Sequence, residues 1–415
     1  MQLAGIEPYY QAVLDNREET NEILQPDLTA SKPSSEVVTR LIAHIRNGTT
    51  DQALTQLRIP ARHFVDESRH QAELRLMRSV PVVIGRSTDL TNNGDFITRT
   101  VLGTPIIVVR QTNGTIAAYI NMCKHRGGQV ESEPSGSKRV FMCQYHGWTY
   151  NRDGGGLRTV PYESSFGSID YDCSGLTLVA SHERHGFIWL DFAGEAGRSV
   201  ESFLGREFES ILPEYEIDDA VTYRQEVFHL DINWKLIMDG ANDPLHAKFL
   251  HPNGVGKLAS TNISTWDSFG RHGRAAIPRR RTERNVLKDQ PIEETWRFFG
   301  AGLVIYPNSM LVKAPDHVEA WTVWPDPTNP ERSTTEIRLL VRPEILNDQM
   351  SERLDLSWDI LRNAALNEDW PMAQSIQENA RRHPDRALVY GLNEISCQHL
   401  HRVLAADLER LETGS

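Results

Sequence analysis

The stretch from Asp239 to His251 constrains this chain more than any other part of its sequence. It places two carboxylates, Asp239 and Asp243, and two imidazoles, His246 and His251, within thirteen residues. Two histidines and one carboxylate form the ligand set of a non-haem Fe(II) site with open positions for O₂ and a substrate. A further carboxylate lies far downstream, in Glu368-Asp369-Trp370-Pro371. The sequence therefore predicts a mononuclear iron site assembled from two distant parts of the chain.

The spacing of the two histidines restricts the local structure. Residues five apart on an unbroken α-helix point about 140° away from each other. His246 and His251 can therefore share a metal only where a helix is distorted or ends. Pro244 and Pro252 give reasons for such a break, because proline removes a backbone donor and clashes with the preceding turn. The apolar pattern nevertheless predicts a helix over residues 234–250.

Four further metal-binding side chains lie upstream in two short segments, Cys123-Lys-His125-Arg-Gly-Gly and Cys143-Gln-Tyr-His146-Gly-Trp. Each segment offers one thiolate and one imidazole, a set that suits either zinc or a [2Fe–2S] cluster. Zinc fingers usually separate the cysteine pair from the histidine pair. A Rieske cluster instead binds two thiolates on one iron and two imidazoles on the other. One Cys and one His from each of two loops suit the Rieske arrangement.

Composition excludes several other classes of protein. A net charge of −12 argues against a nucleic-acid-binding protein, because phosphate contacts need a clustered basic face. No apolar run approaches the roughly 18 residues that span a bilayer, and no signal peptide is recognisable at the N-terminus. Two of the four cysteines lie in a metal-binding pattern, which favours a reducing compartment. We therefore expect a cytoplasmic protein that binds neither nucleic acid nor membrane.

The order of apolar and turn signals predicts an α+β protein in three parts. Residues 1–55 show a helical period and are expected to pack on the last part as an N-terminal helical segment. Residues 56–193 show short strands and turns, including a Thr112-Asn113-Gly114 hairpin turn, and predict a small all-β module. Residues 194–415 mix strands with helices and contain the iron motif, so they form the predicted catalytic domain.

The two Cys and His segments form the Rieske signature, Cys-x-His-Arg-Gly with Cys-x₂-His-Gly-Trp. From Cys123 to Glu163 the sequence resembles the large (alpha) subunit of aromatic-ring-hydroxylating oxygenases, and from Asn233 to His251 it resembles the catalytic iron motif of the same family. The resemblance covers residues 56 to 382 and implies an all-β Rieske [2Fe–2S] domain inserted into a helix-grip catalytic domain with an antiparallel sheet.

This resemblance also implies a role for each site residue. The Rieske cluster would be held by Cys123, His125, Cys143 and His146. The mononuclear Fe(II) would be held by His246, His251 and Asp369, with Glu368 as the alternative to Asp369.

Asp243 has a different implied role. In the family, the matching aspartate links the iron-ligand histidine to a Rieske histidine of the neighbouring subunit, so Asp243 would link His246 to His146 of the next copy in a head-to-tail homotrimer. Asp239, Gly240 and Ala247 resemble substrate-pocket positions. Asp239 departs from the pattern, because relatives commonly carry Asn there. It could be an alternative ligand, a proton donor or a hydrogen-bonding partner of its surroundings.

The resemblance implies a terminal oxygenase that uses O₂ and electrons from a separate NAD(P)H reductase, directly or through a ferredoxin, and a small-molecule, aromatic substrate. Hydroxylation or cis-dihydroxylation of the ring is the expected reaction, and oxidative O- or N-demethylation is the alternative. Val160-Pro-Tyr-Glu163 resembles large subunits that pair with a small β subunit in an α₃β₃ assembly.

Three other features have no assigned role. Six arginines at 271, 274, 279, 280, 281 and 284 could form a solvated loop, a docking surface for an acidic electron donor, or an anion-binding site. His399 and His401 are two residues apart on a predicted helix, so their rings should point apart. Cys173 and Cys397 have no histidine at ligand spacing and are expected to be buried.

Overall fold

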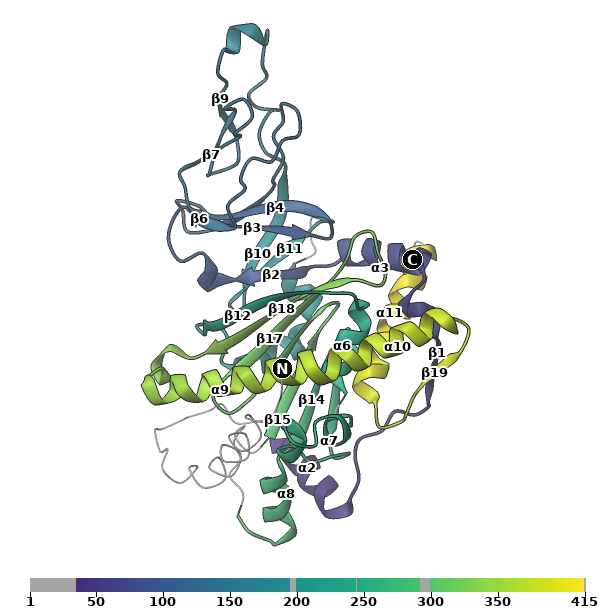
Figure 1. Cartoon of the computed structure of the whole chain (residues 1–415). Helices are drawn as coiled ribbons and strands as arrows, with labels where there is room; N and C mark the ends of the chain where they lie inside the picture. The colour runs from purple at the N-terminus through teal and green to yellow at the C-terminus, as the bar shows by residue number, and fades with distance from the viewer. Residues whose placement is uncertain (1–34, 195–198, 244, 292–298, 414–415) are drawn as a thin grey trace, which may run out of the picture.

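The computed structural model describes residues 35–194, 199–243, 245–291 and 299–413, and it has two stacked parts (Figure 1). An upper module of strands stands on a larger part that contains a sheet and most of the helices. The predicted α+β class is confirmed. Among the helices of the described residues, none combines the length and apolar character needed to cross a membrane. Pro244, expected to break the iron-motif helix, and residues 296–298 of a predicted strand lie outside the described residues.

The upper module is built on a seven-stranded antiparallel sheet of order β2-β11-β10-β5-β4-β3-β6. A second sheet, of order β7-β8-β9, lies above it (Figure 1). The predicted hairpin turn at 112–114 joins β4 to β5, with Gly114 at φ +83°, a backbone angle that glycine adopts without strain. The strands are β2 (Val82–Arg86), β3 (Asp95–Val101), β4 (Thr104–Arg110), β5 (Ile116–Ile120), β6 (Ser135–Ser137), β7 (Val140–Met142), β8 (Thr149–Asn151), β9 (Leu157–Thr159), β10 (Leu178–Arg184) and β11 (Phe187–Asp191).

The lower part contains a seven-stranded antiparallel sheet of order β12-β18-β17-β16-β15-β14-β13. Its central strands are buried on both faces, because neighbouring residues of β18 such as Leu339 and Leu340 belong to two different hydrophobic cores. The strands are β12 (Val221–Leu230), β13 (Thr265–Phe269), β14 (His272–Pro278), β15 (Phe299–Ile305), β16 (Ser309–Lys313), β17 (Val318–Pro325) and β18 (Ser333–Val341).

A continuous helical segment crosses the lower part (Figure 1). It consists of α9 (Asp348–Ala364), a π-helical turn η9 (Ala365–Asp369) and α10 (Trp370–Arg382). Helix α6 (Trp234–Asn242) packs between α10 and strand β17, and α11 (Ile395–Thr413) packs on α6. The shorter helices are α4 (Val200–Leu204), α5 (Arg206–Ile211), α7 (Ala247–Leu250) and α8 (Arg280–Leu287).

The chain enters and leaves the upper module from the lower part. Strand β1 (Leu57–Pro60) pairs with β19 (Ala387–Tyr390) near the other end of the chain, and α3 (Glu67–Arg78) packs on α11. The upper module is therefore an insertion, as expected. Residues 57–78 lie against the lower part, although we expected them at the start of the upper module, and the domain boundaries themselves stay predictions.

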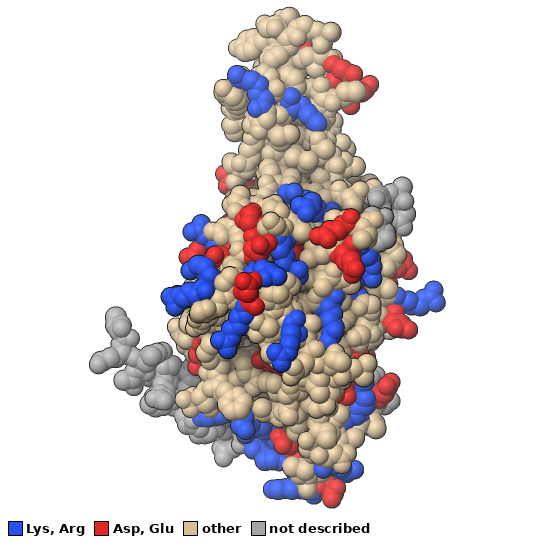
Figure 2. All heavy atoms as spheres, turned by 90° about the vertical axis from the view of Figure 1, so that its right-hand side faces the viewer, with Lys and Arg blue, Asp and Glu red and all other residues tan. Residues whose placement is uncertain are grey.

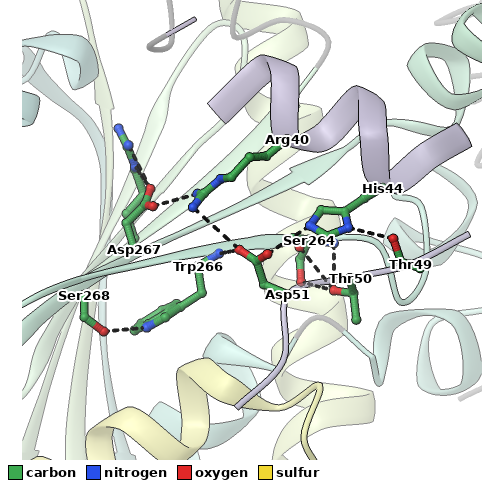
Figure 3. A network of polar contacts seen from close by, with 10 residues as sticks. Arg40, His44, Thr49, Thr50, Asp51, Ser264, Trp266, Asp267 and Ser268 are labelled. Atoms are coloured by element: carbon green, nitrogen blue, oxygen red, sulfur yellow. Dashed lines mark hydrogen bonds and ion pairs between the residues drawn. The ribbon is translucent and has the colours of Figure 1, made fainter. Parts of the chain in front are cut away.

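Helix α2 (Ser35–Asn47) lies against the edge of the lower sheet. Val37, Val38 and Leu41 on its apolar face belong to the core of the lower part. A polar network joins the helix to strand β13 (Figure 3). In it Arg40 donates to the Asp267 carboxylate at 2.6 Å, and His44 contacts Asp51 at 2.9 Å. The contacts fix this segment on the lower sheet.

Candidate active site

The loops that carry the Cys and His pairs have the same backbone design. In the first, the Gly127 N–H donates to the Cys123 carbonyl at 2.9 Å, and in the second the Gly147 N–H donates to the Cys143 carbonyl at 2.9 Å. Gly127 has φ +75° and Gly147 has φ +72°, which residues with a Cβ rarely adopt. The two glycines therefore turn each loop back on its own cysteine and give both loops one shape.

The four side chains separate by burial in the way a Rieske cluster requires. Cys123 and Cys143 are each only 3% exposed, whereas His125 and His146 are partly exposed. The two imidazole rings lie 4.5 Å apart, and His125 stacks on Trp148. A cluster between the loops would have its thiolate-bound iron inside the module and its imidazole-bound iron at the surface.

A single ion fits these four residues less well. Ligands of one zinc ion lie about 2.0–2.3 Å from the metal, so their donor atoms converge. Across the described residues, His246, His251 and Asp369 form the one group of three or more His, Cys, Asp or Glu side chains with donor atoms within 4.8 Å of one another. The Cys and His pairs are spread more widely, as the ligands of a two-iron cluster are.

Hydrogen bonds also prepare the first loop for a charged cluster. The Tyr150 hydroxyl lies 3.1 Å from the Cys123 sulfur and accepts from the Lys124 N–H at 3.0 Å. Burial and the contact with Cys123 raise the pKa of Tyr150, so the phenol stays a donor. At the surface, the Arg126 guanidinium donates to His146 Nε2 at 2.6 Å and lies over the Tyr145 ring. The outer nitrogen of His146 is thus accessible to a polar partner.

The predicted helix over 234–250 is wrong, and the break has a functional consequence. Helix α6 ends at Asn242, and the short helix α7 begins after His246. His251 follows α7 with a non-helical backbone (φ −115°, ψ 49°). The helix ends, as sharing of one metal by His246 and His251 requires, and both rings turn to the same point.

The three predicted iron ligands meet there. His246 Nε2 lies 3.1 Å from His251 Nε2, and the Asp369 carboxylate lies 3.4 Å from the first nitrogen and 3.0 Å from the second. Ligands held at right angles about 2.1 Å from one metal are about 3 Å apart. The geometry fits three ligands on one face of a single ion. Asp369 closes the π-helical turn η9, a distortion that often marks functional sites.

Both imidazoles are oriented through their other nitrogen. His246 Nδ1 donates to the main-chain carbonyl of Asp243 at 2.7 Å, and His251 Nδ1 contacts the Glu368 carboxylate at 2.5 Å. Such outer contacts fix the tautomer and direction of a metal-binding histidine. Glu368 therefore orients His251 in this geometry, and Asp369 is the carboxylate that reaches both Nε2 atoms. The Asp243 carboxylate, which we expected to accept from His246, lies 3.6 Å from Nδ1.

The charges of the site suit a cation. Burial lowers the pKa of His246, but hydrogen bonds to Asp243 and Asp369 outweigh burial and raise the pKa to about 10. Burial raises the pKa of Asp369, but hydrogen bonds from both histidines outweigh burial and lower it. The Asp369 carboxylate beside the two imidazoles thus favours a positive charge at this point. A divalent ion bound there would supply that charge in place of a proton.

The three pocket predictions stay predictions. Asp239 and Gly240 lie on α6 and Ala247 begins α7, and all three are partly buried. The Asp239 carboxylate accepts from the Tyr390 hydroxyl at 2.7 Å and lies 2.9 Å from His401 Nε2. Of the three roles considered for Asp239, hydrogen bonding to its surroundings is the one found. Sequence reasoning did not name Tyr390 and assigned no role to His401, because neither lies near a motif.

The arginine cluster is divided between structural and exposed positions. Arg271 lies in the turn before strand β14, Arg274 lies on β14, and Arg280 begins helix α8. The segment is therefore a strand and a helix and not one loop, although Arg281 and Arg284 on α8 are exposed. Arg271 makes two hydrogen bonds to the Asp407 carboxylate, and the buried Arg274 pairs with Asp267. These two guanidinium groups join elements of the fold. They are not available to dock a protein or bind an anion.

The remaining cysteines and histidines behave differently from one another. Cys397 is buried as expected, but Cys173 is exposed, which corrects its prediction. His399 contacts the Arg271 carbonyl and His401 contacts Asp239, so the two rings point apart as predicted.

The family models match both parts of the chain. The Rieske [2Fe-2S] domain matches residues 80–178, and the ring hydroxylating alpha subunit (catalytic domain) matches residues 217–410. The chain belongs to the Rieske oxygenase alpha subunits. These oxygenases are oxidoreductases that incorporate O₂, and their cofactors are a Rieske [2Fe–2S] cluster and a mononuclear iron. The family predicted from sequence is confirmed.

Relatives of this oxygenase differ in what they act on. The carnitine monooxygenase oxygenase subunit of Escherichia coli (strain K12) is 25% identical over 367 residues, covering 84% of this chain and 92% of the relative. The benzene 1,2-dioxygenase subunit alpha of Pseudomonas putida is 37% identical over 196 residues, which are 46% of this chain and 43% of the relative. A solved quaternary ammonium Rieske monooxygenase with L-carnitine has the same fold, with TM-score 0.72 and 19% identity over 88% of this chain and 97% of that one.

Proposed function

We propose that this oxygenase is the terminal component of a multicomponent system, with Fe(II) held by His246, His251 and Asp369. The observation that carries the proposal is the convergence of the three donor atoms at 3.0–3.4 Å, with both outer imidazole nitrogens fixed. Fe(II) bound by two histidines and one carboxylate has open positions for O₂ and substrate. Electrons would arrive through a cluster held by Cys123, Cys143, His125 and His146.

We propose a head-to-tail homotrimer in which Asp243 links His246 to His146 of the next copy. The Asp243 side chain is 21% exposed, and its carboxylate lies 3.6 Å from Nδ1 of the iron ligand His246. It is therefore accessible to a residue of a neighbouring subunit. Large apolar side chains are exposed around the cluster, at Tyr145 and Tyr162, and beside the iron site, at Phe249 and Met372. Exposed apolar patches of this kind support an interface. A small β subunit could bind in addition.

The proposed reaction is hydroxylation or cis-dihydroxylation of an aromatic ring, supported by the ring-hydroxylating family model and the benzene dioxygenase relative. Oxidative O- or N-demethylation is the second candidate. It is supported by the carnitine monooxygenase relative, whose similarity extends over both parts of the chain. Each reaction uses one O₂, two electrons and two protons. Cis-dihydroxylation places both oxygens in the product, hydroxylation also yields one water, and demethylation yields formaldehyde and one water.

The proposed electron donor is a ferredoxin, an NAD(P)H reductase, or both. A candidate surface for the donor is the face shown in Figure 2, which carries basic side chains with acidic ones among them. Exposed arginines on α3, β1, the end of α10 and the turn after β1 are Arg58, Arg62, Arg75, Arg78, Arg381 and Arg382. Acidic partners are present among them, including Asp385 beside Arg62. Electrostatic docking here would make turnover fall with salt.

Substrate-dependent O₂ uptake with a surrogate reductase and ferredoxin tests the reaction. A panel of aromatic hydrocarbons, aromatic acids and methylated amines, run under ¹⁸O₂, distinguishes the candidates. A ring product with two labelled oxygens supports cis-dihydroxylation, and one labelled oxygen supports hydroxylation. Formaldehyde released in proportion to O₂ supports demethylation. Metal analysis should give about three irons and two sulfides per chain, and two irons without the third would contradict the oxygenase site.

Asp243→Asn tests the bridge. The variant should keep both metal centres, because the main-chain carbonyl that accepts from His246 remains. It should nearly abolish oxygenation, because the amide lacks the charge and the second acceptor oxygen of the carboxylate that would meet the partner's histidine. Single-turnover oxidation of the reduced cluster, followed by absorbance, measures the electron transfer. A wild-type rate in the variant would remove Asp243 from the bridge.

A further inference from the structure

Four side chains from the C-terminal part of the chain hold the last turn of α6. Tyr390 and His401 hydrogen bond to the Asp239 carboxylate at 2.7 and 2.9 Å. Cys397 Sγ donates to the Asp239 carbonyl at 3.6 Å, and Ser396 Oγ donates to the Asn242 carbonyl at 2.6 Å. The four come from β19 and α11, which lie about 150 residues downstream of α6. Asp239 receives three of the four contacts, so it is the centre of this attachment.

The Asp239 carboxylate is the acceptor in both of its side-chain contacts. His401 is 3% exposed, and its Nδ1 has no hydrogen-bond partner within the part of the chain that the structure describes. A proton on that nitrogen would be a buried donor without an acceptor, which is costly. His401 therefore donates to Asp239 through Nε2. Burial and the nearby Asp239 charge raise the pKa of Tyr390, so the phenol keeps its proton and donates as well.

A short chain of contacts leads from Asp239 to the iron ligands. Asp243 directly follows α6, and its N–H donates to the Gly240 carbonyl at 3.4 Å. The Asp243 carbonyl in turn accepts from His246 Nδ1 at 2.7 Å. The direction of His246 thus depends on where α6 ends. The position of the last turn of α6 depends in turn on the hydrogen bonds that Asp239 makes with Tyr390 and His401.

We propose that Asp239 is a positioning residue for the oxygenase reaction: clamped by Tyr390 and His401, it fixes the end of α6 and so places Asp243 and His246. The inference rests on the proposed iron site and assigns the C-terminal strand and helix to it. It also explains why a carboxylate suits position 239, because both neighbours donate to it. An asparagine would offer one acceptor and would turn its amide N–H groups toward one of the two donors.

The test compares Tyr390→Phe, His401→Leu and Asp239→Asn with a matched control, His399→Leu, on the same helix. His399 bonds to the Arg271 carbonyl, and among the described residues His401 is the histidine that bonds to Asp239. The measurements are the Fe(II) dissociation constant of the otherwise intact protein and the EPR spectrum of its nitric oxide complex, with the cluster spectrum and Tm as controls for folding. We expect the three variants to weaken Fe(II) binding about 3- to 10-fold, less than loss of a direct ligand contact, and to change the rhombicity of the EPR signal.

His399→Leu should lower Tm while leaving Fe(II) affinity and the EPR signal as in wild type. His401→Gln, whose amide can still donate to Asp239, should have the Fe(II) affinity and EPR signal of wild type, in contrast to His401→Leu. The inference is overturned if the three variants lower Tm like the control and leave the iron signals unchanged. If Asp239→Asn does not fold, Tyr390→Phe, which removes one hydroxyl only, decides the result. Wild-type protein that binds no Fe(II) at the triad would instead contradict the proposed function.

Discussion

The loops around Cys123 and Cys143 and the triad around His246 are built from different kinds of contact. Each cluster loop closes on itself within five residues, through a glycine N–H that donates to the cysteine carbonyl. The triad joins the two histidines that flank α7 to Asp369 of the π-helical turn η9, and His251 and Asp369 are 118 positions apart. It also depends on α3, β19 and α11, which hold the two ends of α6.

This difference predicts different sensitivities. A change within one loop should affect the cluster and leave the iron, whereas a change in the packing around α6 should affect the iron and leave the cluster. The two sites share one chain, so each variant carries its own control: the spectrum of the cluster reports on one site, and the third iron reports on the other.

Replacement of the triad carboxylate should have the largest effect. Asp369→Ala removes one of three ligands, so the Fe(II) site should weaken by more than the roughly 10- to 100-fold expected for loss of an outer contact. Total iron should fall to that of the cluster, and the visible spectrum should be unchanged. Glu368→Gln is the matched variant and should keep the iron with a smaller loss of affinity. Full retention of iron in Asp369→Ala would transfer the ligand role to Glu368 or Asp239.

The buried ion pair at the start of α6 should come next. Lys235 Nζ lies 2.6 Å from Glu73, which is 0% exposed and also accepts from Trp234 and Arg69. Glu73→Gln leaves a buried ammonium without its counter-ion, which costs about 3–5 kcal/mol. Chemical unfolding measures the loss. Iron should dissociate at a lower denaturant concentration than the cluster bleaches, and simultaneous loss of both would remove the distinction between the sites.

A double variant gives the control for this pair. Glu73→Gln with Lys235→Met removes both charges, so it should recover part of the lost unfolding free energy. No recovery would mean that Glu73 acts through Trp234 and Arg69 and not through Lys235.

Alkaline pH should weaken the lower part of the oxygenase. Burial lowers the pKa of His317, but the Asp316 charge and hydrogen bond outweigh burial and raise it from 6.5 to about 9. Asp316 also pairs with Arg353 of α9, the helix that leads to Asp369. A raised folded-state pKa stabilises the protein fully below the unfolded pKa of 6.5, and this contribution is lost as pH rises through about 9. At most about 3 kcal/mol is expected.

His317→Gln checks the titration, because the variant lacks the proton. The unfolding free energies of wild type and variant should differ most near pH 6 and converge by pH 10. A constant difference over that range would remove His317 as the titrating group.

Two glycine variants should have the smallest effects and should affect the cluster alone. A Cβ at Gly147 would lie 2.9 Å from Pro161 Cγ, whereas a Cβ at Gly127 would have Met122 atoms at 3.9 Å. Both positions carry the cost of a left-handed backbone, about 1–2 kcal/mol. Gly147→Ala adds a clash, so it should lose its cluster at a lower temperature than Gly127→Ala. Iron in the triad should be unaffected in both. Loss of the cluster at the same temperature in both variants would show that the left-handed backbone, and not the clash with Pro161, determines the effect.

The sequence by itself determined the family, the α+β fold and both cofactors, and it selected His246, His251 and Asp369, which converge in the fold. The cluster motifs are short, so their loop geometry follows from residues that are neighbours in the chain. The tertiary structure decided what residues far apart in sequence do. In the fold, α6 ends at Asn242 and Glu368 contacts His251. Arg271 and Arg274 form internal ion pairs. Asp239 hydrogen bonds to Tyr390 and His401. The physical reason is that a carboxylate or a guanidinium group can pair with many polar groups of the chain. Only the packing of distant helices and strands decides which of these groups lies within hydrogen-bond distance.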